Sequence, residues 1–366
     1  MPEPRAPELI PEFLYAVACC RATRSAEQEK WLRDQAIDWP LFLRVARRHR
    51  IEGLVWRALR TAGVDVPPDS ASALQAAADR IGRDNLVAAA ESGRLRARFD
   101  DAGIPLLFVK GLSLGVLAYG SIVPKAGWDI DILIGKSSLT RAVTLLQADG
   151  YEMIVPSGPA TPERIAAWHA HAKESVWRHP GRGTHIELHT ALSDHPMLLA
   201  GVGMQSPRQE VGIAENVALP TLGPDELFAY LAVHGASSAW FRLKWIADLA
   251  ALLDGRSPEE IERLYRRSQA LGAGRAAALA LLLLDRLFGT PLPPSLLASL
   301  RRERANRWLL AASLRSLAGR AAATELGRLP LGTAWIHLTQ FALLPGARYK
   351  LGELWRQVRP FLRRAR

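Results

Sequence analysis

The chain has 366 residues, of which 49% are hydrophobic and 23% are charged. These fractions are close to the average for globular proteins, so wholesale disorder is excluded. A chain of this length predicts about two or three domains or layers rather than one core. The formal net charge of +11 favours anionic partners such as nucleotides, nucleic acid or an acidic membrane surface, unless it reflects only a solvated basic surface.

No segment of the sequence predicts a membrane span, a secretion signal or a disulfide framework. The longest uninterrupted apolar run, from Ala276 to Leu284, is closed by Asp285, well short of the ~20 residues that a span needs. The N-terminus lacks a basic segment followed by an apolar stretch, so no signal peptide is expected. Cys19 and Cys20 are adjacent and suit neither a disulfide framework nor a zinc site. We therefore expect a cytoplasmic protein.

The first hundred residues predict helices. Apolar residues recur at helical spacing through residues 39–48 and again through 51–59. Gly63 and the prolines that follow it interrupt the pattern. A long helix is then expected from Asp69 or Ser70, either of which can cap it, to the glycine at 103.

Beyond residue 103 the period changes from helical to strand-like. Short apolar runs predict strands at 104–109, 128–134 and 151–155, and the first of these runs is continuous, as in a buried strand. Helices are expected between the three strands. Residues 174–178 and 184–188 predict a hairpin around a Pro-Gly-Arg-Gly turn. Strands are expected only within roughly 104–192.

From residue 223 onward the pattern is helical again, with helices expected at 224 onward, 240–253 and 258–271. The segment after Arg348 is strongly basic and carries one apolar helical face, interrupted by Pro360. This segment can dock on the body of the protein, bind an acidic membrane or bind nucleic acid. Docking on the protein is the interpretation we favour. The apolar face comprises Leu351, Leu354, Trp355, Val358, Phe361 and Leu362.

The strongest chemical signal is Asp129-Ile130-Asp131 on a predicted strand. Period two sends both carboxylates to one face and the isoleucine to the other. Carboxylates about 7 Å apart along a strand repel one another unless a cation lies near them. Hard oxygen ligands in this arrangement suit Mg²⁺, which usually keeps substrate phosphates among its ligands. Alone, the pattern is also compatible with a polar strand face without function.

Two further features strengthen the metal hypothesis. Lys110-Gly111 follows the preceding strand and opens a helix, and backbone N–H groups at such a helix start bind phosphate. Glu187 lies on the later hairpin strand, where alternation places His185, Glu187 and His189 on one face. A third carboxylate there would complete a metal-binding set and could accept a proton from an attacking hydroxyl.

The ordered set of these motifs resembles the polymerase-β-type nucleotidyltransferases, and more closely a bacterial family of uncharacterised nucleotidyltransferases. The resemblance covers most of the chain, roughly residues 10–360. Two departures are Lys110-Gly111 in place of Gly-Ser, with Ser113 two residues on, and Lys125 in place of arginine. The matching residues are Lys110-Gly111, Lys125, Asp129 to Ile134, Ile186 to His189, Arg47 to Ile51, Ala102 to Pro105, His234 to Ala236, Trp240, Arg242 to Trp245 and Asp248-Leu249.

The resemblance implies an α+β fold in which a polymerase-β-like palm, residues 103–222, lies between helical regions at 1–102 and 223–366. It implies transfer of a nucleoside monophosphate from an NTP such as ATP to an unknown acceptor, which could be a small molecule, a peptide or RNA, with Mg²⁺ or Mn²⁺. The implied metal ligands are Asp129, Asp131 and Glu187; the implied nucleotide ligands are Lys110, Gly111, Ser113 and Lys125; and His189, His234, Arg242 and Lys244 are candidates for lining the cleft.

Three other hypotheses remain open at this stage. The basic surface could bind a tRNA or protein that the enzyme modifies. A palm without turnover could serve only to bind nucleotides. Gly111-Leu112-Ser113-Leu114-Gly115 also matches the G-x-S-x-G elbow of serine hydrolases, although the helical segment before it lacks the strands that an α/β-hydrolase needs.

Overall fold

The computed structural model describes residues 7–127, 129–318, 322–329 and 331–364, with side chains described as far as Arg359 at the C-terminal end. Trp128, the first residue of a predicted strand, and the side chains of Phe361 and Leu362 in the basic tail therefore lie outside the described residues. Along the described helices, none combines the length and the apolar character that crossing a membrane requires.

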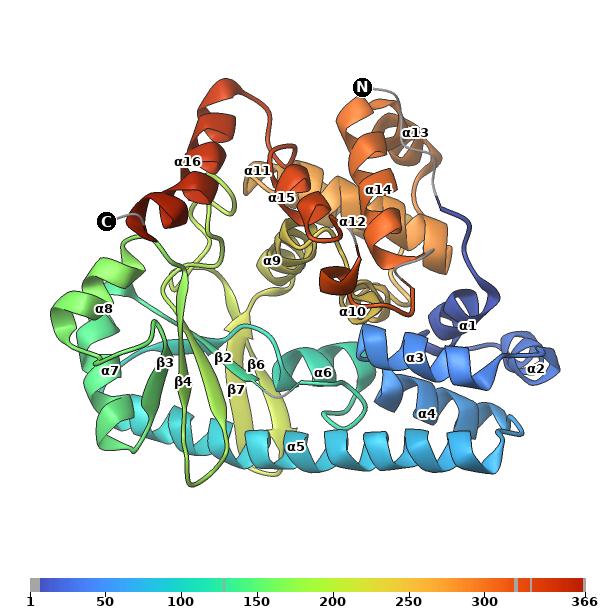
Figure 1. The fold of residues 1–366 in the computed structure, drawn as a ribbon, viewed down its shortest axis with the longest axis horizontal. Helices are drawn as coiled ribbons and strands as arrows, with labels where there is room; N and C mark the ends of the chain where they lie inside the picture. The colour runs from blue at the N-terminus through green and yellow to red at the C-terminus, as the bar shows by residue number, and fades with distance from the viewer. Residues whose placement is uncertain (1–6, 128, 319–321, 330, 365–366) are drawn as a thin grey trace. The chain divides into compact units, whose positions relative to one another are not determined.

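The chain forms two compact units (Figure 1), which we call the sheet unit and the helical unit. The sheet unit comprises Asp79–Pro196 and Gly201–Leu227, and the helical unit comprises Met1–Ala78, Met197–Ala200 and Phe228–Arg366. The helical unit thus combines segments from both predicted helical regions. The division of the chain at residues 102 and 222 stays a prediction.

A five-stranded mixed sheet with the order β1-β2-β5-β4-β3 forms the centre of the sheet unit. Strands β2 and β5 are parallel, whereas β1 pairs antiparallel with β2, β4 with β5, and β3 with β4. The fold class is therefore α+β, as predicted. The strands are β1 (Leu106–Phe108), β2 (Asp129–Ile134), β3 (Glu152–Val155), β4 (Glu174–Arg178) and β5 (His185–His189).

Helices cover one face of this sheet and form the core of the unit with it. The C-terminal half of α5 runs across the strands (Figure 1), and its Leu95 and Phe99 pack in one cluster with Ile130, Trp177 and Ile186. Fully burying such a side chain contributes about 1.5–3 kcal/mol, so this face determines the register of β2 and β5. The helices of the unit are α5 (Pro68–Asp101, shared with the helical unit), α6 (Leu112–Tyr119), α7 (Leu139–Ala148) and α8 (Pro162–His169), and a 3₁₀ turn, η1 (Lys136–Ser138), precedes α7.

The prediction that strands occur only within residues 104–192 was wrong. Arg208–Ala214 (β6) and Val217–Leu222 (β7) form a separate antiparallel ribbon. Their apolar residues do alternate: Val211, Ile213 and Leu219 are buried, while the residues flanking the first two are more exposed. The signal was missed because the two strands follow a long stretch without regular structure and include Pro220 within β7.

The helical unit buries a core made largely by α12, the helix that contains the longest apolar run of the chain. From Ala276 to Leu284 every residue of α12 is buried. Several helices begin at clear capping signals, such as Ser257, whose side chain and that of Glu260 form a capping box on α11. The helices are α1 (Pro11–Cys19), α2 (Ala26–Asp34), α3 (Trp39–His49), α4 (Glu52–Ala62), α9 (Pro224–Ser237, which begins in the sheet unit), α10 (Leu243–Leu252), α11 (Pro258–Ala270), α12 (Gly274–Phe288), α13 (Pro294–Arg302), α14 (Arg304–Leu317), α15 (Ala334–Gln340) and α16 (Ala347–Arg364), with a 3₁₀ turn, η3 (Leu326–Arg328).

Gly235 of α9 packs tightly against the turn that follows the helix. A Cβ on Gly235 would lie 2.3 Å from the indole ring of Trp240, which is completely buried. We expect Gly235→Ala to lower the free energy of unfolding by about 1–3 kcal/mol through overpacking, although alanine ordinarily stabilises a helix by about 1 kcal/mol relative to glycine. Urea denaturation measures the sign directly, and Gly203→Ala, where a Cβ meets nothing within 4 Å, is the control.

The C-terminal helix α16 corrects a second expectation, namely that its apolar face docks on the protein. Leu351, Leu354, Trp355 and Val358 are 40–65% exposed. The helix is held instead through its other side, where Tyr349 and Glu353 are buried. Helical periodicity identified the apolar face correctly, but periodicity does not reveal what an apolar face contacts.

Candidate active site

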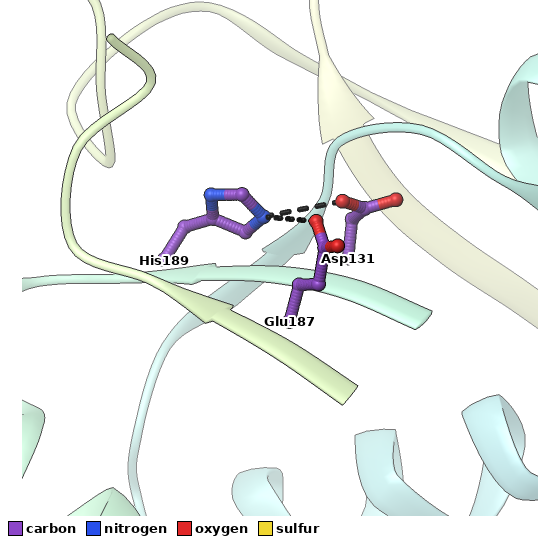
Figure 2. Close-up of side chains that lie close together, drawn as sticks. All are labelled: Asp131, Glu187 and His189. Atoms are coloured by element: carbon purple, nitrogen blue, oxygen red, sulfur yellow. Dashed lines mark hydrogen bonds and ion pairs between the residues drawn. The ribbon is translucent and has the colours of Figure 1, made fainter. Parts of the chain in front are cut away.

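Strands β2 and β5 bring two acidic side chains and a histidine together. Their parallel register pairs Asp131 directly with Glu187, and His189 follows two residues later on β5. The three side chains point toward one another from the same face of the sheet (Figure 2), with ligand atoms all within 4.8 Å of one another. The predicted third carboxylate thus lies beside the Asp-x-Asp strand.

The alternation of the two strands explains this geometry. Ile130, Ile132, Ile186 and Leu188 are buried in the core on the helix-covered face. Because successive side chains point to opposite faces, the polar residues between them must face the other way. The apolar residues therefore set the position of the acidic ones.

Lys110 supplies a positive charge directly beside this group. Its Nζ lies 2.6 Å from Asp131 Oδ1 and 3.7 Å from Glu187 Oε2. The chain reaches this position because Val109 N–H donates to the Asp131 carbonyl at 3.2 Å, after which Gly111, with φ of +65°, turns into α6. Burial alone would raise the pKa of Asp131, but the Lys110 ammonium and His189 outweigh it and hold this pKa well below its usual range.

His189 lies among three carboxylates. Its Nε2 is 3.1 Å from Asp131 Oδ1 and 3.5 Å from Glu187 Oε2, and its Nδ1 is 3.2 Å from Glu174 Oε2 on β4. Burial lowers the pKa of this imidazole, but its hydrogen bonds to Asp131 and Glu187 outweigh burial, so the pKa is raised. His189 thus contacts all three carboxylates, two through Nε2 and one through Nδ1.

Glu187 differs electrostatically from its neighbour across the strands. Its side chain is 23% exposed, and burial together with the Asp131 charge raises its pKa, despite the opposing effect of His189 and Lys110. The two paired carboxyls thus lie in different electrostatic surroundings, although they are neighbours across the strands.

Asp129 is half-buried at the start of β2 and lies outside the tight group of ligand atoms. It lines a small hollow together with Lys110, Gly111 and Asp131. Both carboxylates of the Asp-x-Asp strand therefore border the turn that leads into α6.

Comparison with known proteins agrees with this geometry. A family model described as uncharacterised nucleotidyltransferase matches residues 35–289. The chain belongs to this family. The resemblance noted from the motifs is thereby confirmed, and the protein is a transferase of nucleotidyl groups. A search of curated proteins finds no match to the chain.

Two further residues of the predicted nucleotide site of this nucleotidyltransferase lie near the turn but not among the carboxylates. The Ser113 hydroxyl is buried and makes no hydrogen bond with any described residue. Lys125 is buried in the loop before β2, its Cδ lies beside Gly115 of α6, and its carbonyl accepts a hydrogen bond from Asn85 at 2.9 Å. Their roles in binding nucleotide stay predictions.

The remaining cleft candidates of the nucleotidyltransferase belong to the helical unit. Arg242 donates to both carboxylate oxygens of Glu325, at 2.8 and 2.9 Å, and to the Arg48 carbonyl. The ring of His234 contacts those of Tyr230 and Trp245, and Lys244 is partly exposed on α10. Arg242 thus has an intramolecular partner in its own unit, and a contact of these three residues with substrate stays a prediction.

Two features of the site were missed by sequence reasoning. Glu174 was placed on a hairpin strand without a role, although antiparallel pairing of β4 with β5 places it directly opposite His189. The hairpin register itself could have revealed this neighbour. Lys110 was assigned to phosphate alone, because nothing in the local sequence indicates that its side chain turns back to Asp131.

The donor set fits a hard divalent cation. Asp131 and Glu187 offer carboxylate oxygens, the ligands that Mg²⁺ and Mn²⁺ prefer. The Lys110 ammonium lies beside the carboxylate oxygens of both residues, so their position favours a positive charge. Asp129, at the edge of the same hollow, is a further oxygen donor.

Proposed function

We propose that the sheet unit is a polymerase-β-like palm that transfers a nucleoside monophosphate from an NTP to an acceptor hydroxyl or phosphate, releasing pyrophosphate. The observation that carries the proposal is the direct register of Asp131 with Glu187 on adjacent parallel strands. Family membership supports nucleotidyl transfer in general. The metal, the NTP and the acceptor are the finer parts of the proposal.

Asp129, Asp131 and Glu187 are the residues that would hold divalent cations, with Mg²⁺ preferred and Mn²⁺ an alternative. When bound, such ions would neutralise phosphate charge and stabilise the attacking and leaving oxygens. The repulsion between these carboxylates is the physical reason that cation binding is favourable there.

Lys110 and Gly111 would hold the triphosphate. The α6 N-terminus presents backbone N–H groups beside them, which favour anionic oxygens. The Lys110 ammonium pairs with Asp131. We propose that it exchanges this carboxylate for a phosphate oxygen on nucleotide binding, so that the positive charge moves from the metal ligands to the substrate.

Glu187 would accept the proton of the attacking acceptor group. It is the more exposed of the two paired carboxylates, so an incoming acceptor can reach it. His189, hydrogen-bonded to Asp131 and near Glu187, would orient both. A carboxylate within hydrogen-bond reach of the acceptor contributes typically 10²–10⁴-fold to rate.

The other hypotheses are weighed by specific observations. The buried Ser113 hydroxyl, without a base among the described residues, argues against the serine-hydrolase elbow. The presence of Glu187 in the site argues against a palm that only binds nucleotides. The net charge of +11 is compatible with an RNA or acidic peptide acceptor.

The proposal is tested by incubating the pure protein with each labelled NTP, Mg²⁺ or Mn²⁺, and cell extract. Label transferred to any acceptor with matching pyrophosphate release supports it. A salt-sensitive transfer to RNA would identify a nucleic acid acceptor. Absence of pyrophosphate release with every NTP and both metals, in protein that binds nucleotide, would leave the non-catalytic module as the better hypothesis.

Nucleotide and metal should stabilise the protein jointly. A ligand that binds only the folded state adds about 2.7 kcal/mol at a hundredfold excess over its Kd. We expect a rise in Tm that needs both Mg²⁺ and the preferred NTP, is lost in Asp131→Asn and persists in Glu163→Gln, an exposed acidic residue on α8. The same rise with NTP in EDTA would contradict the role assigned to the metal.

A further inference from the structure

The exposed side of α16 is an apolar stripe, which we define as Leu351, Leu354, Trp355 and Val358. Their side chains are 65%, 50%, 59% and 40% exposed, respectively. Residues three and four apart lie on one helix face, so the four form a continuous ridge rather than scattered apolar atoms. Clustered exposed apolar side chains on a helix usually mark a contact surface.

The opposite side of α16 is held to α15 by polar contacts. The Tyr349 hydroxyl donates to the Gln340 carbonyl at 2.7 Å, and Gln357 Nε2 donates to the His337 carbonyl at 3.0 Å. Glu353 is buried and accepts two hydrogen bonds from Arg356 at 2.9 and 2.6 Å. The helix therefore buries part of its polar side and presents its apolar side outward, so its orientation is fixed by the protein itself.

Cationic side chains border the stripe. Arg348 and Lys350 are exposed, and at 100° per residue Lys350 lies along one edge of the stripe while Arg348 and Arg359 lie along the other. Glu353 is the only acidic residue of α16, and it is turned inward and paired with Arg356. The exposed side of the helix thus combines apolar and positive groups without a negative one.

We propose that α16 binds the surface of a lipid bilayer with anionic headgroups, with the stripe inserted below the headgroups and the bordering cations at their level. Leucine, tryptophan and valine between basic residues form the side-chain pattern that such interfacial helices use. A second copy of the chain fits less well, because a two-fold contact through this face brings the basic borders of two copies together. The binding adds to nucleotidyl transfer and does not depend on it.

Vesicle sedimentation with the full chain tests the proposal. We expect the protein to pellet with vesicles of phosphatidylcholine and phosphatidylglycerol and to stay in solution with vesicles of phosphatidylcholine alone. Leu351→Glu combined with Trp355→Glu should abolish binding. Leu86→Glu, at a 60% exposed site on α5, is the matched control and should bind like the wild type.

Charge and insertion are measured separately. Arg348→Gln and Lys350→Gln should each weaken binding about fivefold. Lipids brominated in the acyl chain should quench the wild-type tryptophan fluorescence, and this quenching should largely disappear in Trp355→Phe while the variant still pellets. The Trp355→Phe exchange is conservative at an exposed site, so it tests insertion in a folded protein.

Three outcomes would overturn the proposal. One is failure of the wild type to bind anionic vesicles. A second is equal loss of binding in Leu86→Glu and in the double variant. A third is a concentration-dependent dimer, seen by analytical ultracentrifugation without lipid, that Leu351→Glu and Trp355→Glu dissociate, since the stripe would then belong to an interface between copies.

Discussion

Asp131→Asn should abolish nucleotidyl transfer and also lower the Tm of the nucleotide-free protein. The loss of activity is expected to be at least about a thousandfold, because a ligand of the proposed catalytic metal provides several kcal/mol of transition-state stabilisation. The loss of stability follows from the structure: the Lys110 ammonium, 2.6 Å from Asp131, and the buried His189 lose their shared counter-charge. Breaking a buried pair costs about 3–5 kcal/mol.

This expectation reverses what the sequence suggests, since two neighbouring carboxylates without a cation would gain stability when one is neutralised. Asp129→Asn is therefore the informative comparison, because Asp129 lies outside the tight group and should lose activity without a comparable loss of Tm. Activity is followed by pyrophosphate release and stability by calorimetry.

A double variant separates catalysis from folding in this experiment. In Lys110→Gln with Asp131→Asn, neither side chain is charged, so much of the lost stability should return. Transfer should stay absent, because the metal ligand is still missing. Full activity of Asp131→Asn, or a higher Tm than the wild type, would contradict the arrangement proposed here.

Most of the sheet unit was predictable because its strands have strong local signals. Period two in β2 and β5 fixed which side chains face the core, and the short turn between 178 and 185 fixed the hairpin. Pairing of β2 with β5 is a long-range contact that periodicity cannot predict. The strand phase predicted Glu187 beside the Asp pair only on condition that the hairpin joins the same sheet, and the structure pairs Asp131 directly with Glu187.

Long flexible side chains were the least predictable part of the site. Lys110 has four rotatable methylenes and can reach either a phosphate in the hollow or the Asp131 carboxylate, and only coordinates show that it contacts the carboxylate. Arg242 likewise pairs with Glu325, more than eighty residues away in the sequence. Sequence spacing identifies strand neighbours well, whereas partners distant along the chain depend on the packing of whole elements.

Glu187→Gln should reduce turnover severely and leave NTP binding nearly unchanged. Glutamine keeps the shape of the side chain but neither holds a second cation nor accepts the acceptor's proton. We expect kcat to fall by about two to four orders of magnitude, while KM for the NTP changes little because Asp129, Asp131 and Lys110 remain. The Tm should also change little, since the closest carboxylate to Lys110 is that of Asp131.

Glu174→Gln is the matched control for this variant, because it removes the same charge beside the other nitrogen of His189. If Glu187 acts directly on the acceptor, Glu174→Gln should reduce kcat far less. Equal losses in the two variants would mean that both residues act by orienting His189. Single-turnover pyrophosphate release in Glu187→Gln at the wild-type rate would contradict the assignment of the third carboxylate, because the chemical step would then proceed without it.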